Sequence, residues 1–148
     1  MPKHFVTWIV IADASRAQIV TRREDQGGFD LVTAFQSPEA HASSHELGPA
    51  RPGRGQESAN PAHHAIEPRV DPHEESAVAF LRTVADYLNE NATNTEIHRL
   101  ILFAPPRALG HLRKMLNAAV RLKIRHEEPK DLTRVPLADL AKHLEALP

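Results

Sequence analysis

The hydrophobic and polar residues of this chain follow two different patterns. One is typical of β-strands and the other of α-helices. Residues 5–12, FVTWIVIA, are almost all apolar and rich in β-branched side chains, which is typical of a strand buried on both faces. Two more strands are predicted at 18–24 and 29–36, on either side of the turn residues DQGG. We therefore expect the chain to open with a three-stranded antiparallel meander.

The second half of the sequence predicts helices that alternate with two further strands. Asp71 can cap the first helix, Pro72 fits its first turn, and Glu74 completes the spacing of a capping box. Beyond this helix the apolar pattern predicts, in order, a strand at 97–104, a helix at 105–120, a strand at 121–128 and an amphipathic helix at 131–147.

The order of these elements, three strands followed by α-β-α-β-α, is the layout of a ribonuclease H-like α/β fold. Helical crossovers would make the strand at 97–104 parallel to the strand at 5–12, because such connections return the chain to the same sheet. We predict a mixed five-stranded sheet with helices on its faces. The length of 148 residues fits one domain, 1–148.

A long segment, 37–73, interrupts this pattern between the third strand and the first helix. It holds six of the twelve prolines and five of the ten histidines, but few large apolar residues. Structureless loops of this length inside a compact domain are usually functional or disordered. We expect a long inserted loop, with GPARPGRGQESANPAHH at 48–64 as its most informative stretch.

Composition narrows the chemistry further. The chain has no cysteine, which excludes disulfides, thiolate metal ligands and a cysteine nucleophile. The apolar run near its start is too short to span a bilayer and lacks the pattern of a secretion signal, so we expect a cytoplasmic protein without membrane insertion. The net charge is -1, yet residues 97–134 hold nine Lys or Arg against three acids, which suits either a nucleic-acid backbone or an ordinary solvated surface.

Three segments resemble the host attachment protein family of bacteria: HHAIEPRVDPHEESAVAFLRTVADYLNE, RLILFAPPRALGHLRKML and KDLTRVPLADLAKHL. The opening WIVIADASRAQIV fits the same family, so the resemblance covers nearly the whole chain in order. The family is named for a phenotype, the attachment of a bacterium to its host. It is in turn similar to the middle domain of eukaryotic and archaeal class-1 peptide release factors, which also has a ribonuclease H-like layout.

The resemblance to release factors implies a role for the long loop. In those factors the loop after the meander carries Gly-Gly-Gln, and the Gln helps a water molecule attack the ester of peptidyl-tRNA. Gly55 and Gln56 match the second Gly and the Gln, while Arg54 stands where the first Gly would be. Gln56 and Gly55 are thus the catalytic candidates, and Arg51 and Arg54 would meet phosphates. A chance match in a solvated loop is the alternative.

The family signature that leads into the first helix includes His64, Glu67 and Asp71, which we interpret as residues that anchor the loop and start the helix. His41 and His45 have their Glu after the pair rather than inside it, unlike a zinc-protease helix, and we predict no metal and no other cofactor. A two-metal nuclease site is also rejected, because the fourth strand ends in FAPPR and offers no carboxylate.

A second candidate site lies where the first and fourth strands are expected to end together. There Asp13, Ser15 and Arg16 would come close to Arg107, which opens the helix after the fourth strand. A helix N-terminus favours anions, and an arginine beside it can bind a phosphate or a carboxylate. Alternatively, Arg107 is solvated or pairs with Asp13.

Our favoured hypothesis is a binding module with no or weak catalysis that contacts the ribosome or tRNA through the loop at 48–64 and the basic half of the chain. One alternative is a hydrolase of the peptidyl-tRNA ester, acting in ribosome rescue and using Gln56. Another is a factor related to host attachment or adhesion, again without catalysis.

Overall fold

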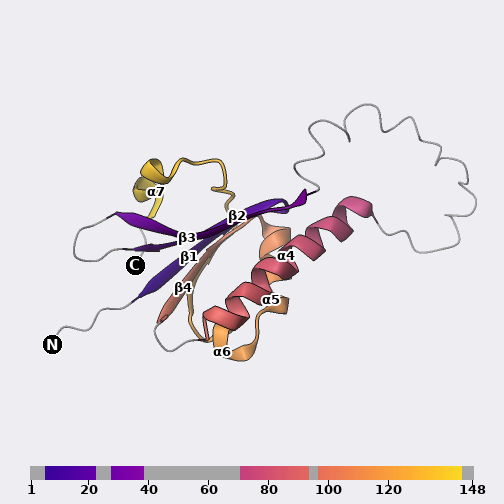
Figure 1. The fold of residues 1–148 in the computed structure, drawn as a ribbon, viewed down its shortest axis with the longest axis horizontal. Coiled ribbons are helices and arrows are strands. Elements are labelled where there is room, and N and C mark those ends of the chain that lie inside the picture. The colour runs from indigo at the N-terminus through magenta and orange to yellow at the C-terminus, as the bar shows by residue number, and fades with distance from the viewer. Residues whose placement is uncertain (1–5, 23–27, 39–70, 94–96, 145–148) are drawn as a thin grey trace, which may run out of the picture.

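The computed structural model describes residues 6–22, 28–38, 71–93 and 97–144. These residues form five strands and four helices (Figure 1). In chain order the elements are β1 (Thr7–Ala12), β2 (Arg16–Arg22), β3 (Phe29–Gln36), α4 (Pro72–Asn91), β4 (Arg99–Phe103), α5 (Pro106–Met115), α6 (Ala118–Arg121), β5 (Ile124–Glu128) and α7 (Leu137–Leu144).

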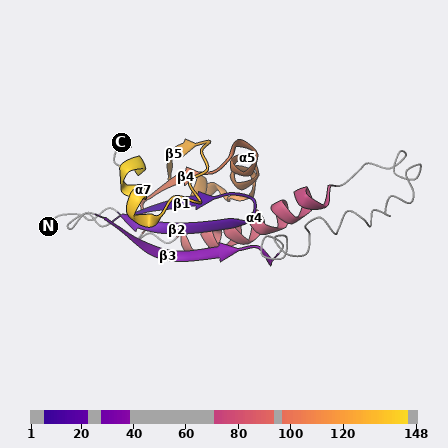
Figure 2. The same ribbon diagram turned by 90° about the horizontal axis from the view of Figure 1, so that it is seen from above.

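The five strands form one mixed sheet in the order β3-β2-β1-β4-β5 (Figure 2). β2 pairs antiparallel with both β1 and β3, which confirms the predicted meander. β4 lies parallel to β1, and β5 lies parallel to β4, as expected when helical crossovers return the chain to the sheet. The predicted α/β class and the mixed five-stranded sheet are therefore confirmed.

Side chains of the central strands divide the core into two clusters, one on each face of the sheet. Trp8 and Val10 pack with α4 and α5, whereas Ile9 and Ile11 pack with α7 on the other face (Figure 1). Every residue of β1 is buried, as its apolar run predicts for a strand between two layers. The cluster under α7 is the smaller one, and Ala34 of β3, in register with the β1 and β2 residues of that face, is exposed.

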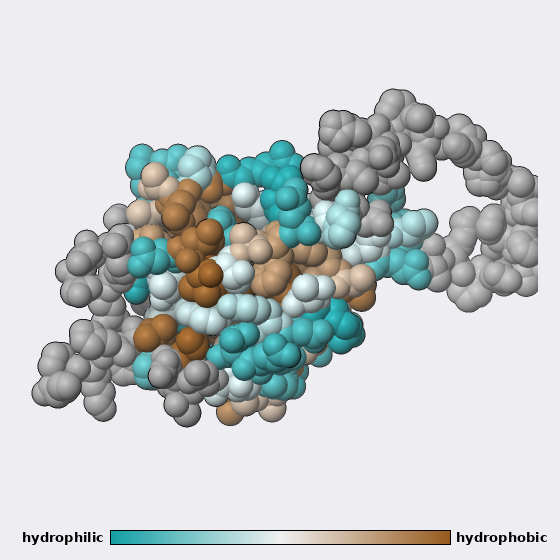
Figure 3. Space-filling model, in the orientation of Figure 1, coloured by the Kyte–Doolittle hydropathy of each residue, from teal (hydrophilic) through white to brown (hydrophobic). Residues whose placement is uncertain are grey.

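The described surface carries few large hydrophobic side chains. Those exposed by more than a third are Leu31, Leu122 and Leu137. On the side seen in Figure 3, hydrophobic patches are separated by hydrophilic ones. None of the helices in the described ranges is long and apolar enough to cross a membrane.

The start of α4 follows the prediction at Asp71 and Pro72 and departs from it at Glu74. Asp71 is the N-cap, and its carboxylate accepts a hydrogen bond from the backbone N–H of His73 at 3.0 Å. Glu74 does not complete a capping box, because its carboxylate instead contacts the ring of His111 on α5 at 2.9 Å. Packing of α5 beside α4 thus offers Glu74 a partner that the local sequence does not reveal.

The stretch predicted as one helix, 105–120, consists of two helices. α5 ends at Met115, Leu116 adopts an extended backbone with φ -80° and ψ 139°, and the side chain of Asn117 caps α6. Asn89 of α4 bridges the break, since its amide donates to the carbonyl of Met115 at 3.1 Å and accepts from the N–H of Asn117 at 2.9 Å. A contact between distant segments therefore stabilises the interruption.

The last strand and the last helix begin later than predicted. β5 starts at Ile124, because α6 occupies the preceding residues. α7 starts at Leu137, directly after Pro136, rather than at Asp131. The side chain of Asp131 accepts a hydrogen bond from the N–H of Thr133 at 2.9 Å, so a turn replaces the first part of the predicted helix.

Candidate functional site

The carboxyl edge of the sheet, where β1 and β4 end and β2 begins, gathers most candidate residues of the described chain. The segment predicted as a long loop, 37–73, is described only near its ends. One end is attached here because Ser37 donates its backbone N–H to the carbonyl of Ser15 at 2.8 Å. The other end enters α4, whose Glu74 lies 3.7 Å from Arg107 at the start of α5. Both ends are thus anchored at the same edge.

Asp13 organises the turn between β1 and β2. One of its carboxylate oxygens accepts hydrogen bonds from the backbone N–H groups of Ser15 and Arg16, both at 2.8 Å. The other oxygen accepts the hydroxyl hydrogen of Thr133 at 3.0 Å, which ties the segment before α7 to the turn. Asp13 therefore shapes the carboxyl edge and fixes the position from which Arg16 extends.

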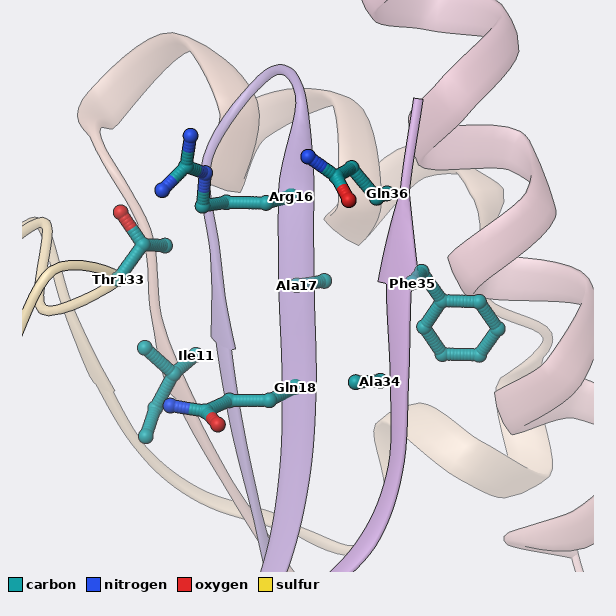
Figure 4. A pocket seen from close by; sticks show the side chains of 8 residues that line it. All are labelled: Ile11, Arg16, Ala17, Gln18, Ala34, Phe35, Gln36 and Thr133. Atoms are coloured by element: carbon teal, nitrogen blue, oxygen red, sulfur yellow. The ribbon is translucent and has the colours of Figure 1, made fainter. Parts of the chain in front are cut away.

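Arg16 lines a groove of about 370 Å³ beside this turn, which we call the Arg16 groove. Figure 4 shows Arg16 and Gln18 reaching from β2 toward Thr133 and the β1 side, while Gln36 comes from β3. The Nε atom of Arg16 is buried and has no hydrogen-bond partner among the described residues. A buried donor without a partner costs about 1–3 kcal/mol, so the local packing holds this nitrogen at an energetic cost.

Three groove residues were not singled out from the sequence: Gln18, Gln36 and Thr133. Their side chains add two amides and a hydroxyl to the guanidinium, a set that can both donate and accept hydrogen bonds. Strand pairing places Arg16 opposite Gln36, and the alternation along β2 puts Arg16 and Gln18 on one face. That alternation was the available signal for Gln18; nothing local in the sequence points to Thr133.

Arg107 lies in a different cluster from the Arg16 groove. Its side chain is 80 % exposed and lies 3.7 Å from Glu74, rather than pairing with Asp13. Glu74 also contacts His111 at 2.9 Å, so the glutamate connects α4 to two residues of α5. The structure therefore brings Asp13 and Arg16 together, whereas Arg107 pairs with Glu74 instead.

The remaining candidates lie outside the described residues; they are Arg51, Arg54, Gly55, Gln56, His64 and Glu67. Asp71 is described, and it caps α4. Within the described ranges, no group of three or more His, Asp or Glu side chains is placed to hold a metal ion.

The basic stretch 97–134 contributes partly paired and partly unpaired charges to the surface. Arg113 pairs with Glu127, and this hydrogen bond and charge raise the pKa of the guanidinium. Lys130 lies 3.4 Å from Glu128. Among the described residues, no ion pair involves four exposed side chains of this stretch: Lys114, Arg121, Arg125 and Arg134.

The model of one protein family, described as "Protein required for attachment to host cells", matches residues 8–144. This chain belongs to that family. The match runs from β1 into the end of α7 and includes nearly all of the described structure. The resemblance of the sequence to the host attachment family is therefore confirmed. Among curated proteins, none matches the sequence.

Two solved structures superimpose on this host attachment protein at low sequence identity. An archaeal translation termination factor, aRF1, superimposes with a TM-score of 0.51 at 11 % identity, over 94 % of this chain and 35 % of the factor. Dom34 of S. cerevisiae, a translation termination-like factor, gives a TM-score of 0.45 at 11 % identity, over 94 % of this chain and 36 % of that protein. This chain thus spans about a third of the length of each. The likeness to aRF1 confirms the predicted ribonuclease H-like fold.

Proposed function

We propose that this host attachment protein is a binding module that contacts ribosomal RNA or tRNA through the segment 48–64, carried by a single domain of residues 1–148. The main support is the joint anchoring of the long segment at the carboxyl edge, beside Arg16 and Arg107. The fold shared with part of an archaeal translation termination factor supports the same class of partner.

The residues of the segment suit close contact with a nucleic-acid backbone. Gly55 lets another chain approach closely, because it has no Cβ. Arg51 and Arg54 can donate hydrogen bonds to phosphate oxygens, and the amide of Gln56 can donate and accept. Arg16, at the root of the segment, adds a guanidinium whose buried Nε lacks a partner in the described structure.

The unpaired basic side chains of α5, α6, β5 and the segment before α7 provide a second source of affinity. Phosphate contacts from Lys and Arg supply most of the sequence-independent part of nucleic-acid binding. The chain as a whole has a net charge of -1, so this attraction is local rather than a field of the whole molecule.

Co-sedimentation with ribosomes tests the proposal. We expect the wild-type chain to pellet with ribosomes, and a variant whose residues 48–64 are replaced by a Gly/Ser linker of equal length to bind at least about tenfold more weakly. Arg82→Gln is the matched control, because Arg82 is an exposed residue of α4 that lies outside the segment 37–73 in the sequence. The proposal is contradicted if the wild-type chain does not bind ribosomes, or if the linker variant binds as tightly as the wild type.

Hydrolysis of the peptidyl-tRNA ester is a second candidate function, supported by the pair Gly55-Gln56. In that case Gln56→Ala should abolish peptide release from stalled ribosomes while co-sedimentation persists. Asn60→Ala, in the same segment, serves as the control and should release peptide normally. A wild-type protein that releases no peptide at any concentration excludes this function and leaves the binding proposal standing.

A further inference from the structure

A second cavity, of about 210 Å³, lies at the opposite end of the sheet from the carboxyl edge. It adjoins the amino ends of β1 and β4, where Thr7 and Arg99 are paired. Thr7 lies roughly 16 Å along β1 from Ala12, which is at the carboxyl edge. We call this cavity the arginine pocket, and it is lined by Thr7, Arg22, Arg99, Ile101, Arg125 and His126.

Three arginines line this small space from three strands, β2, β4 and β5. None of the described residues that line it is acidic. The carboxylate of Glu128 contacts the lining residue His126 at 2.9 Å, and it also lies 3.4 Å from Lys130 outside the lining. Several positive charges around one cavity produce a potential that attracts an anion into it.

Two side chains of the arginine pocket, those of Arg22 and His126, are positioned by contacts outside it. Arg22 donates a hydrogen bond to the carbonyl of Leu144 at 3.2 Å, and its guanidinium lies 5.7 Å from the centre of the Phe29 ring. His126 packs edge-on against Phe103, with the ring centres 6.5 Å apart. Side chains that are already ordered lose little conformational entropy when a ligand binds. Ordering them therefore reduces the binding free energy only slightly.

We propose that the arginine pocket binds the phosphoryl group of a small phosphorylated molecule. Planar guanidinium groups donate paired hydrogen bonds to phosphate oxygens, and a tetrahedral phosphate can accept from several of them at once. The cavity is smaller than the roughly 300 Å³ at which pockets begin to hold drug-sized ligands, so it fits a phosphoryl group with a sugar-sized body rather than a length of polynucleotide. The site is independent of the contact with RNA proposed for the segment 48–64.

Isothermal titration calorimetry of the full chain tests the ligand class. Inorganic phosphate and ribose 5-phosphate are the two probes, and sodium acetate and sodium chloride at the same ionic strength are the controls. We expect both phosphorylated probes to bind saturably and acetate to produce no more heat than chloride. The probe that binds more tightly shows whether the natural source is free phosphate or a phosphomonoester.

Variants then test the position of the site. Arg125→Gln should weaken phosphate binding about tenfold, because it removes one charge-assisted donor at an exposed position. Arg121→Gln, an exposed arginine of α6 that does not line the pocket, should change the affinity by less than about twofold. Glu145→Gln removes the first carboxylate after Leu144 in the sequence, and it should leave the affinity unchanged or raise it.

Four results would overturn the proposal. They are phosphate heats no larger than those of chloride, equal losses in Arg125→Gln and Arg121→Gln, weaker phosphate binding in Glu145→Gln, and a pocket that serves nucleic acid instead. The last would show as an RNA oligonucleotide that loses affinity in Arg125→Gln while phosphate itself does not bind. Circular dichroism of each variant establishes that the fold is retained.

Discussion

Asp13 is the residue on which the turn at the carboxyl edge depends. Asp13→Ala removes the acceptor of two backbone N–H groups and of the hydroxyl of Thr133. Hydrogen bonds to charged groups contribute about 1.5–3 kcal/mol each and do not add fully, so we expect the free energy of unfolding to fall by about 2–4 kcal/mol. Urea denaturation measures the loss. Asp13→Asn keeps one acceptor and should lose less, and equal losses in the two variants would contradict this role.

Glu128 gives the fold a defined dependence on pH. Its pKa is lowered from the ordinary 4.5, mainly by the hydrogen bond with His126 and further by Lys130, against the opposing effect of partial burial. A carboxyl group with a lowered folded-state pKa stabilises the fold above its unfolded-state pKa, and this contribution disappears as the pH falls through the folded-state pKa. The stabilisation at neutral pH should therefore be lost on acidification.

The comparison of wild type with Glu128→Gln by urea denaturation measures this effect. The difference in the free energy of unfolding should be present at about pH 6 and vanish well below the unfolded-state pKa. Asp86→Asn, at an exposed position of α4, is the control for the loss of one carboxylate charge. If the difference in the free energy of unfolding between wild type and Glu128→Gln stays constant down to about pH 3, the lowered pKa of Glu128 is not the cause.

At the scale of elements, the sequence predicted those features that are controlled locally. β1 and β4 are apolar after their first residues, Thr7 and Arg99, and both strands lie within the predicted ranges. The break between α5 and α6 was missed because the apolar residues Leu116 and Val120 continue the pattern of the preceding helix. The side chain that stabilises the break, Asn89, is 28 positions away from Asn117. Local periodicity carries no information about such a partner.

Replacing Asn89 with alanine tests the origin of this break. Asn89→Ala leaves the carbonyl of Met115 and the N–H of Asn117 without their partner, and it should lower the free energy of unfolding by about 1–3 kcal/mol. Thermal and urea denaturation provide the measurement. Glu90→Ala, at the exposed neighbouring position, is the control and should stay within about 0.5 kcal/mol of wild type. A similar loss in both variants would show that Asn89 has no special role.

At the scale of the whole molecule, the order of strands explains why the site could be predicted only in part. Asp13 and Arg16 belong to one local turn, so the sequence brought them together correctly. Thr133 is 120 positions from Asp13 and reaches the same turn only because the segment before α7 crosses that face of the sheet. Gln36 enters the Arg16 groove through pairing of β2 with β3. These juxtapositions arise from tertiary packing rather than from local pattern.

The proposed binding of nucleic acid involves two parts of the chain, the segment 48–64 and the basic side chains of 97–134 that have no ion pair among the described residues. Their contributions can be separated by the salt dependence of binding. The logarithm of the binding constant falls linearly with the logarithm of the salt concentration, and each phosphate contact made by Lys or Arg makes this slope steeper. A neutral amide such as that of Gln56 adds affinity with little effect on this slope. The slope therefore reports charge contacts, whichever residue dominates the affinity.

The combined variant Lys114→Gln, Arg121→Gln and Arg134→Gln applies this test and spares the arginine pocket. If the basic surface follows the RNA, the slope should become shallower by about 2, because each phosphate that a Lys or Arg neutralises contributes roughly 0.7–0.9 to it. Gln56→Ala should leave the slope unchanged, because it removes no charge. Fluorescence anisotropy with labelled tRNA over a range of KCl concentrations measures both. An unchanged slope in the triple variant would show that other residues make the phosphate contacts. Lys114, Arg121 and Arg134 would then be ordinary solvated surface residues.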